Sequence, residues 1–363
     1  MAKSKVFFID MRTSGKSMLD KMEAMLKAAG FFDIEFKGKF VAIKLHFGEP
    51  GNLSYLRPNY AARIVALVES GGGKPFLTDC NTLYKGRRSN AVDHLLAASE
   101  NGFNMLSAGC NVIIADGLRG TDFREIEIGK KHVKSAKIGS AIAEADVVIS
   151  LSHFKGHEMT GFGGTIKNLG MGSGSVGGKL EMHSDSKPEI KREACVGCGA
   201  CVRNCAQGAI VLDSGKKAVI DYAKCVGCGQ CIAMCRYDAA CPTWNAVSAQ
   251  EKIAEYALAV VRGKPCFHIS FVMNVSPDCD CWGSNDASIV PDIGILASAD
   301  PVALDRACFD LVNAAPANKG SAAEGHGGKD VFQAAHPGVD GRIGLDYAES
   351  IGLGTQAYEL VRA

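Results

Sequence analysis

The sequence predicts an α/β protein in which a mostly parallel sheet, covered by helices, is interrupted by a small cysteine-rich α+β domain. Short apolar runs alternate with helical patterns along most of the 363 residues, which is typical of strands that pair in parallel and are covered on both faces. Near the middle of the chain, eight of the fifteen cysteines repeat one spacing. We therefore expect one α/β domain, residues 1–187 and 244–363, with an inserted domain at residues 188–243.

The expected strands are apolar runs, and the first expected helix carries Met18, Met22 and Met25 on one face. Gly30 follows that helix, where a left-handed cap belongs. The strands are Val6–Ile9, Val41–Phe47, Pro75–Thr78, Val112–Ala115, Val147–Leu151, Phe267–Met273 and Asp292–Ala297. The helices are Lys16–Ala29, Asn59–Ser70, Asn90–Asn101, Ile138–Ala145, Ser248–Val261 and Asp300–Asn313.

Two motifs of spacing C-x2-C-x2-C-x3-C make up the cysteine repeat. The first is Cys195, Cys198, Cys201 and Cys205, and the second is Cys225, Cys228, Cys231 and Cys235. This spacing lets three thiolates of one loop hold a cubane cluster while the fourth reaches a second cluster. We therefore predict two [4Fe–4S] clusters with crossed ligands: Cys195, Cys198, Cys201 and Cys235 for one, and Cys225, Cys228, Cys231 and Cys205 for the other.

Other interpretations of these cysteines fit less well. A zinc ribbon uses two separated C-x2-C knuckles, and a disulfide framework suits a short secreted chain. The apolar run near the N-terminus is too short for a secretory signal. Cys241, which precedes Pro242, is an alternative last ligand, but the spacing of Cys235 matches the first motif.

Composition excludes several classes of protein. The formal net charge is +1, no apolar stretch approaches the length needed to cross a bilayer, and no basic cluster is interleaved with aromatic residues. We therefore expect no membrane segment and no nucleic-acid partner. Abundant free thiols predict the reducing cytoplasm, and oxygen-sensitive clusters predict an anaerobic setting.

Polar side chains follow the ends of five expected strands, where ligands bind in open α/β sheets. These residues are Lys44 and His46; Asp79, Cys80 and Asn81; Asp116; His153, Lys155 and His157; and Cys279 and Cys281. We expect them to line a pocket for a substrate or cofactor. Cys279 and Cys281 could together bind a soft metal; the alternative is two partly buried thiols beside Trp282.

The stretch Gly161–Gly178 contains eight glycines around Lys167 and Asn168. Such glycines allow backbone N–H groups to approach an anion, which Lys167 would neutralise. We therefore predict Gly163, Gly164 and Asn168 as cofactor-binding residues, with a flexible surface loop as the alternative. Neither a dinucleotide-binding nor a Walker motif is present.

Several segments resemble the uncharacterised iron–sulfur centre proteins of the DUF362 family, and residues 188–243 resemble bacterial two-cluster ferredoxins. The family resemblance is carried by residues 44–48, 78–84, 153–157, 163–170 and 291–294. That family often carries a ferredoxin module inside or after its α/β domain, so the resemblance implies the same arrangement here. A fainter similarity, through His157, the following glycine pair and Lys167, is to the cofactor-binding domain of nickel-pincer lactate racemases.

Two classes of function remain open. In an oxidoreductase, a donor protein would reduce the two clusters. The electrons would then pass to a small molecule bound at the carboxyl ends of the strands. His153 or His157 would then supply protons, while Lys44, His46 and Lys167 would hold the ligand. In the alternative, the chain is a non-catalytic electron carrier or a metallocofactor maturation protein that docks to a larger enzyme.

Overall fold

The computed structural model describes residues 3–83, 86–183, 187–225, 230–237, 239–242, 246–325 and 330–363. Within them, eight strands form one sheet in the order β16-β1-β15-β14-β7-β2-β3-β4. Along that order they are Tyr358–Arg362, Ser4–Asp10, Gly294–Ser298, Cys266–Val272, Val147–His153, Phe40–Lys44, Lys74–Asp79 and Val112–Ile114. Of these eight, only β15 runs antiparallel to its neighbours. The prediction of a mostly parallel sheet is confirmed.

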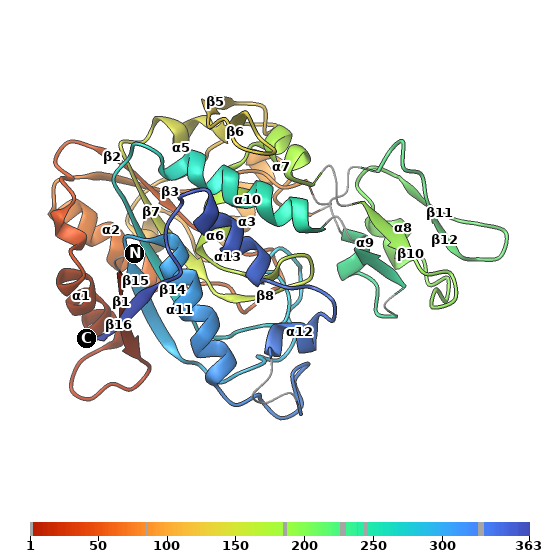
Figure 1. Cartoon of the computed structure of the whole chain (residues 1–363). Coiled ribbons are helices and arrows are strands. Elements are labelled where there is room, and N and C mark those ends of the chain that lie inside the picture. The colour runs from red at the N-terminus through yellow and green to blue at the C-terminus, as the bar shows by residue number, and fades with distance from the viewer. Residues whose placement is uncertain are drawn as a thin grey trace.

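Helices cover both faces of the sheet because successive strand residues point to opposite sides. In β2, Val41 and Ile43 join one apolar core, whereas Ala42 joins the other. The first core includes α1 (Met18–Ala28), α2 (Pro58–Ser70), α3 (Ala91–Glu100) and α4 (Met105–Ala108). The second includes α6 (Thr165–Ser173), α10 (Ala246–Val261), α11 (Pro301–Ala314) and α13 (Arg342–Ser350). Figure 1 shows the sheet between α1 and α2 on one side and α11 and α13 on the other.

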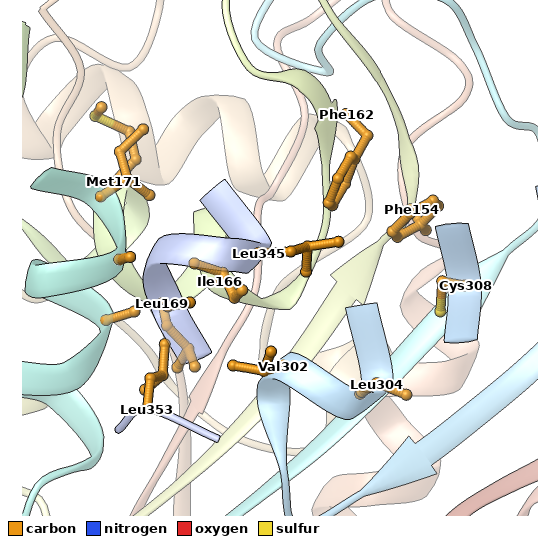
Figure 2. Packing of buried hydrophobic residues seen from close by; sticks show 14 of the residues in the cluster. Phe154, Phe162, Ile166, Leu169, Met171, Val302, Leu304, Cys308, Leu345 and Leu353 are labelled. Carbon is orange, nitrogen blue, oxygen red and sulfur yellow. The ribbon is translucent and has the colours of Figure 1, made fainter. Parts of the chain in front are cut away.

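The second core fixes the position of α6. Ile166 and Leu169 of α6 pack with Val302 and Leu304 of α11 and with Leu345 of α13 (Figure 2). Residues 167, 168, 171 and 172 lie on the opposite face of this helix, since side chains advance about 100° per residue. The buried face of α6 therefore anchors the helix, and its other face is directed toward the carboxyl ends of the strands.

The glycine-rich stretch does not form a loop, as the alternative interpretation proposed. It forms β9 (Gly161–Gly163), α6 and α7 (Val176–His183). At Gly170 a Cβ atom would overlap the carbonyl oxygen of Ile253 in α10. Glycine at this position therefore allows two helices to pack closely, which is a role that glycine density alone does not reveal.

The expected helix Ile138–Ala145 is also corrected. Ser135–Gly139 forms β6, which pairs with β5 (Phe123–Glu127), and only Ser140–Glu144 is helical, as α5. Ile138 is buried through its place in this hairpin. The remaining elements of the α/β part are the short helix η1 (Phe31–Asp33), β8 (Lys155–His157), which pairs with β9, and α12 (Val331–Ala335). None of the described helices combines the length and hydrophobicity needed to cross a lipid bilayer.

Residues 188–242 form a small α+β unit that projects from the α/β part of the chain (Figure 1). We call it the cysteine-rich unit. It contains β10 (Pro188–Ile190) paired with β13 (Ala240–Pro242), β11 (Ile210–Leu212) paired with β12 (Ala218–Ile220), α8 (Ala200–Asn204) and α9 (Gln230–Ala233). Its small core includes Ile210, Ile220, Cys195 and Cys231.

Asp300 joins three parts of the fold, so its replacement by alanine should destabilise the protein. Its Oδ1 accepts from the first backbone N–H groups of α11, and its Oδ2 accepts from Ser4 Oγ at 2.8 Å and Thr355 N at 3.0 Å. We expect Asp300→Ala to cost about 2 kcal/mol. Asp330→Ala, which removes only the cap of α12, should cost about 1 kcal/mol. Urea unfolding compares the two; an equal loss would contradict this reasoning.

Candidate functional site

A cavity lies at the carboxyl ends of β2, β3, β7 and β14. Among the described residues, its walls carry four lysines and one arginine, but a single carboxylate, Asp79. The predicted site residues in its walls are Lys44, His46, His153, Gly164, Lys167, Asn168, Cys279 and Cys281. Most of the strand-end residues predicted from the sequence therefore gather around one cavity, but Asn81, Asp116 and His157 are not among its lining residues.

Lys44, the last residue of β2, forms a buried ion pair. Its Nζ lies 3.0 Å from Asp79 Oδ1, at the end of β3, and donates to Asn168 Oδ1 on α6 at 2.7 Å. Burial lowers the pKa of Lys44, while the charge of Asp79 opposes this effect. Burial also acts to raise the pKa of Asp79, but nearby positive charge, first of all that of Lys44, outweighs it and holds this pKa below its ordinary value.

Arg88 connects His46 to a second buried carboxylate. Its Nε donates to Glu49 Oε2 at 2.8 Å, and a terminal nitrogen lies 2.9 Å from His46 Nε2. The backbone N–H of Gly48 lies 3.0 Å from the other ring nitrogen, Nδ1, so the His46 ring sits between two donor groups. Burial and the charge of Arg88 hold the pKa of His46 well below its ordinary value, so the ring is neutral. No sequence motif surrounds Arg88, and the sequence reasoning missed it.

His153 is held between two oxygen atoms. Its Nδ1 lies 2.8 Å from Asp280 Oδ2, and its Nε2 lies 2.9 Å from the carbonyl oxygen of Met273. Lys155 Nζ is 3.5 Å from the same carboxylate. Since both ring nitrogens of His153 already have acceptors, this geometry favours a role in fixing Asp280. Proton transfer by His153 stays a prediction.

His157 has one ring nitrogen committed to the backbone. The N–H groups of Met159 and Thr160 donate to its Nδ1 at 3.1 and 3.2 Å, so the proton of the neutral ring is on Nε2. His157 lies next to Cys279 and contributes to lowering the pKa of that thiol. His157 is not among the residues that line the cavity, and proton transfer by His157 stays a prediction.

Cys279 and Cys281 are both buried and both line the cavity. The N–H of Trp282 donates to the carbonyl oxygen of Cys279 at 3.2 Å, which closes a β-turn with Asp280 and Cys281 at its centre. Lys167 Nζ lies 3.7 Å from Cys279 Sγ. A hydrogen bond with Cys281 lowers the pKa of Cys279 well below its ordinary value; burial opposes this shift and the charge of Lys167 adds to it.

The first two backbone N–H groups of α6 bind the carboxyl group of Asp305. The N–H groups of Thr165 and Ile166 donate to the two carboxylate oxygens of Asp305 at 2.7 and 2.8 Å. Burial raises the pKa of Asp305 to about 6, although these N–H groups act in the opposite direction. A side chain of α11 thus occupies the N–H groups that were expected to meet a bound anion. Gly164 lines the cavity; Gly163 is not among its lining residues.

A second, smaller cavity lies in the cysteine-rich unit. Its walls include Cys195, Cys198 and Cys201 of the first motif together with Cys235 of the second. The backbone N–H groups of Ala218 and Ala240 lie 3.4 Å from Cys195 Sγ and Cys235 Sγ. Cys241 is directed elsewhere, with its Sγ 3.5 Å from Glu189 Oε1. Three thiols of one loop and the last thiol of the other therefore share one space.

The remaining predicted ligands lie nearby in the same unit. Cys205, Cys225 and Cys231 pack with its small core, and the N–H of Ala209 lies 3.3 Å from Cys205 Sγ. Cys228 lies outside the described residues. No three His, Cys, Asp or Glu side chains of the described ranges are arranged to hold a single metal ion, and metal binding by Cys279 and Cys281 stays a prediction.

The cysteine-rich unit touches the main cavity through Met234. This residue follows α9 and lines the small cavity beside Cys235. It also packs against Cys279, Cys281 and Trp282. One side chain therefore contacts both the space shared by four cysteines and the thiol pair in the wall of the large cavity.

Comparisons with known proteins give one family and a distant likeness to solved structures. Residues 41–310 match the family described as "domain of unknown function (DUF362)". The lactate racemase apoprotein from Thermoanaerobacterium thermosaccharolyticum is 12% identical with a TM-score of 0.36, and the match covers 74% of this chain and 51% of that one. A structural-genomics protein from Thermotoga maritima is 11% identical with a TM-score of 0.38, covering 81% and 57%. This chain thus spans about half the length of these structures, and no curated protein matches it.

Proposed function

The chain belongs to the DUF362 family, and we propose that it is an oxidoreductase that carries two [4Fe–4S] clusters and reduces an anionic small molecule. The clusters would be held in residues 188–243, and the small molecule would bind in the cavity at the carboxyl ends of the sheet. The observation that carries this proposal is the small cavity shared by Cys195, Cys198, Cys201 and Cys235. These are the four cysteines that the crossed spacing assigns to one cluster.

The surroundings of these four thiols suit a cluster. Thiolates are the usual ligands of [4Fe–4S] centres, and hydrogen bonds to the ligand sulfurs tune their potentials. Backbone N–H groups lie within 3.4 Å of Cys195 Sγ and Cys235 Sγ. Ile190, Leu212 and Ala239 supply apolar walls. When bound, such clusters accept and donate single electrons. Cys198 is exposed and marks the side on which an electron-donor protein would dock.

The large cavity suits an anionic ligand and proton transfer. Lys155, Lys167 and Lys179 line it, and the Nζ of Lys179 donates to the carbonyl oxygen of Gly174 at 2.6 Å. These amines would hold carboxylate or phosphate groups of a ligand. Lys167, an ammonium group in the cavity wall, would give a proton to the reduced product. The alternative, a carrier or maturation protein without its own reaction, has no use for a cavity walled by paired thiols, histidines and amines.

Metal content tests the proposal. Chain purified without oxygen should contain iron and acid-labile sulfide for two clusters and give a reduced-cluster spectrum by electron paramagnetic resonance. Cys235→Ala should lose the iron and sulfide of one cluster, because it removes a thiol from the shared cavity. Cys241→Ala is the matched control and should keep both clusters, since Cys241 Sγ faces Glu189.

Two results would overturn the proposal. The first is stoichiometric zinc, or near-absence of iron, in the anaerobic chain. The second is full iron in Cys235→Ala with half the iron in Cys241→Ala, which would reverse the assignment of the last ligand.

A further inference from the structure

We infer that Cys279 and Cys281 are a redox-active pair that cycles between a dithiol and a disulfide, and that Met234 connects this pair to the cluster loop. The inference rests on the proposed function and deepens it, because it names the substrate class as an anionic disulfide. Three independent features of the described residues carry it: the turn that holds the pair, the cavity around it, and the contact made by Met234.

The turn places the two sulfurs within reach of each other. Its closing hydrogen bond, from Trp282 N to the carbonyl oxygen of Cys279, makes the two cysteines the first and third residues of a β-turn. Such residues lie within the range of Cα separations that a disulfide spans. Asp280 is fixed between them by His153, so the backbone of the turn can stay in place while the sulfur atoms move.

The surroundings prepare one sulfur of the pair for attack. Lys167 Nζ lies 3.7 Å from Cys279 Sγ, where its positive charge stabilises a thiolate. The shift in the pKa of Cys279 agrees with this geometry. Burial first, and then the hydrogen bond with Cys279, raise the pKa of Cys281 well above its ordinary value. The pair therefore combines a nucleophilic thiolate with a neighbouring thiol, both facing the same cavity.

The chemistry of such a pair is thiol–disulfide exchange. The sulfur of Cys279 attacks one sulfur of the substrate disulfide, whose S–S bond breaks, and one product leaves as a thiolate. That thiolate takes the proton of Cys281. Cys281 then attacks the sulfur of Cys279 in the mixed disulfide, which forms the Cys279–Cys281 disulfide and releases the second product as a thiolate, which takes a proton from solvent. Two electrons, delivered singly by the donor protein through the clusters, and one proton restore the starting state. The net reaction converts one disulfide, two electrons and two protons into two thiols.

Met234 gives the electrons a short path. It packs on Cys279, Cys281 and Trp282 and also lines the cavity that holds Cys235. In Figure 1, α9, which immediately precedes Met234, lies on the side of the cysteine-rich unit that faces the α/β part of the chain. The cluster assigned to Cys195, Cys198, Cys201 and Cys235 would therefore lie beside a side chain that contacts the thiol pair.

Differential alkylation followed by mass spectrometry tests the pair. The full chain with its clusters is treated anaerobically with oxidised glutathione, an anionic disulfide. We expect Cys279 and Cys281 both to become protected from alkylation as one intramolecular disulfide. Cys281→Ser should instead stop at a glutathione adduct on Cys279. Cys266→Ser is the matched control, because Cys266 lies at the start of β14, outside the cavity walls; it should form the disulfide as the unaltered chain does.

Reduction through the clusters tests the connection. After oxidised glutathione is removed, reduced methyl viologen should return both thiols in the unaltered chain and in Cys241→Ala, but not in Cys235→Ala. If the chain holds its full iron content but Cys279 and Cys281 both remain accessible to alkylation after glutathione treatment, no disulfide has formed. That result would overturn the inference and leave the proposed function intact. A metal retained by the unaltered chain and lost from Cys279→Ser would overturn it too. Absence of clusters would instead defeat the proposed function, and disulfide formation without reduction would defeat the path through Met234.

Discussion

Replacement of Lys44 by methionine is expected to lower the free energy of unfolding by about 3–5 kcal/mol at neutral pH. The ammonium group is the nearest partner of the buried Asp79 carboxylate, at 3.0 Å. Methionine keeps the length of the side chain but leaves that carboxylate buried without its ion-pair partner. The measurement is urea-induced unfolding followed by circular dichroism, with the unaltered chain alongside.

The loss should depend on pH in a definite direction. In the unaltered chain, burial acts to raise the pKa of Asp79, but the charge of Lys44 holds it below its ordinary value. This carboxylate therefore stabilises the fold above about pH 4, and the contribution is lost as the pH falls further. Without Lys44, burial has the larger effect, so the pKa of Asp79 is higher in the folded variant than in the unfolded chain. Protonation of Asp79 then removes the unpaired charge. The stability difference between Lys44→Met and the unaltered chain should therefore become smaller as the pH falls from about 7 to about 4.

Two further variants control this experiment. Lys21→Met removes an exposed ion pair with Asp10, 2.6 Å long, and should leave stability almost unchanged, since solvent screens such pairs. Adding Asp79→Asn to Lys44→Met should recover part of the lost stability, because no unpaired charge then remains. An equal deficit at both pH values, or an equal loss in Lys21→Met, would contradict the assignment of the buried pair.

Gly170→Ala is expected to cost about 3 kcal/mol of stability, the upper part of the range for overpacked cores. The added Cβ would overlap the carbonyl oxygen of Ile253, and backbone of α10 must move to admit it. Because α6 carries Lys167 and Asn168, the same movement should disturb the contacts of both side chains in the cavity. Urea unfolding measures the stability, and alkylation of Cys279 reports the displacement of Lys167 from its sulfur.

Gly177→Ala is the matched control for this variant. Gly177 lies in α7, and a Cβ there would meet nothing closer than 3.7 Å. Alanine should therefore stabilise the helix by up to about 1 kcal/mol, as expected for an unobstructed helical glycine. If Gly170→Ala were as well tolerated as Gly177→Ala, close packing of α6 on α10 would not be the reason for glycine at that position.

The strand pattern was enough to anticipate the main features of the fold. Apolar runs predicted seven of the eight strands of the sheet to within a few residues, and the polar residues after them indicated the edge where the cavity lies. Strands β16 and β5 were missed because their residues are partly buried or exposed and several carry charges, and the end of β6 was assigned to a helix. Lys179 and Arg88 were missed because each reaches the cavity from outside any strand end.

The sequence by itself determined the features that depend on local spacing: two cysteine motifs of identical spacing and a sheet with polar strand ends. Only the tertiary structure decided which partners those residues meet. Lys44 and Asn168 form a hydrogen bond although they are 124 positions apart. The backbone N–H of Thr165 donates to the carboxyl group of Asp305, which belongs to another helix. Periodicity repeats over a few residues, whereas these contacts depend on the order of strands in the sheet and on the close approach of helices. Helix packing thus turns one face of α6, with Lys167 and Asn168, toward the cavity. The tertiary structure also brings Met234 into contact with the apolar cluster that contains Cys279.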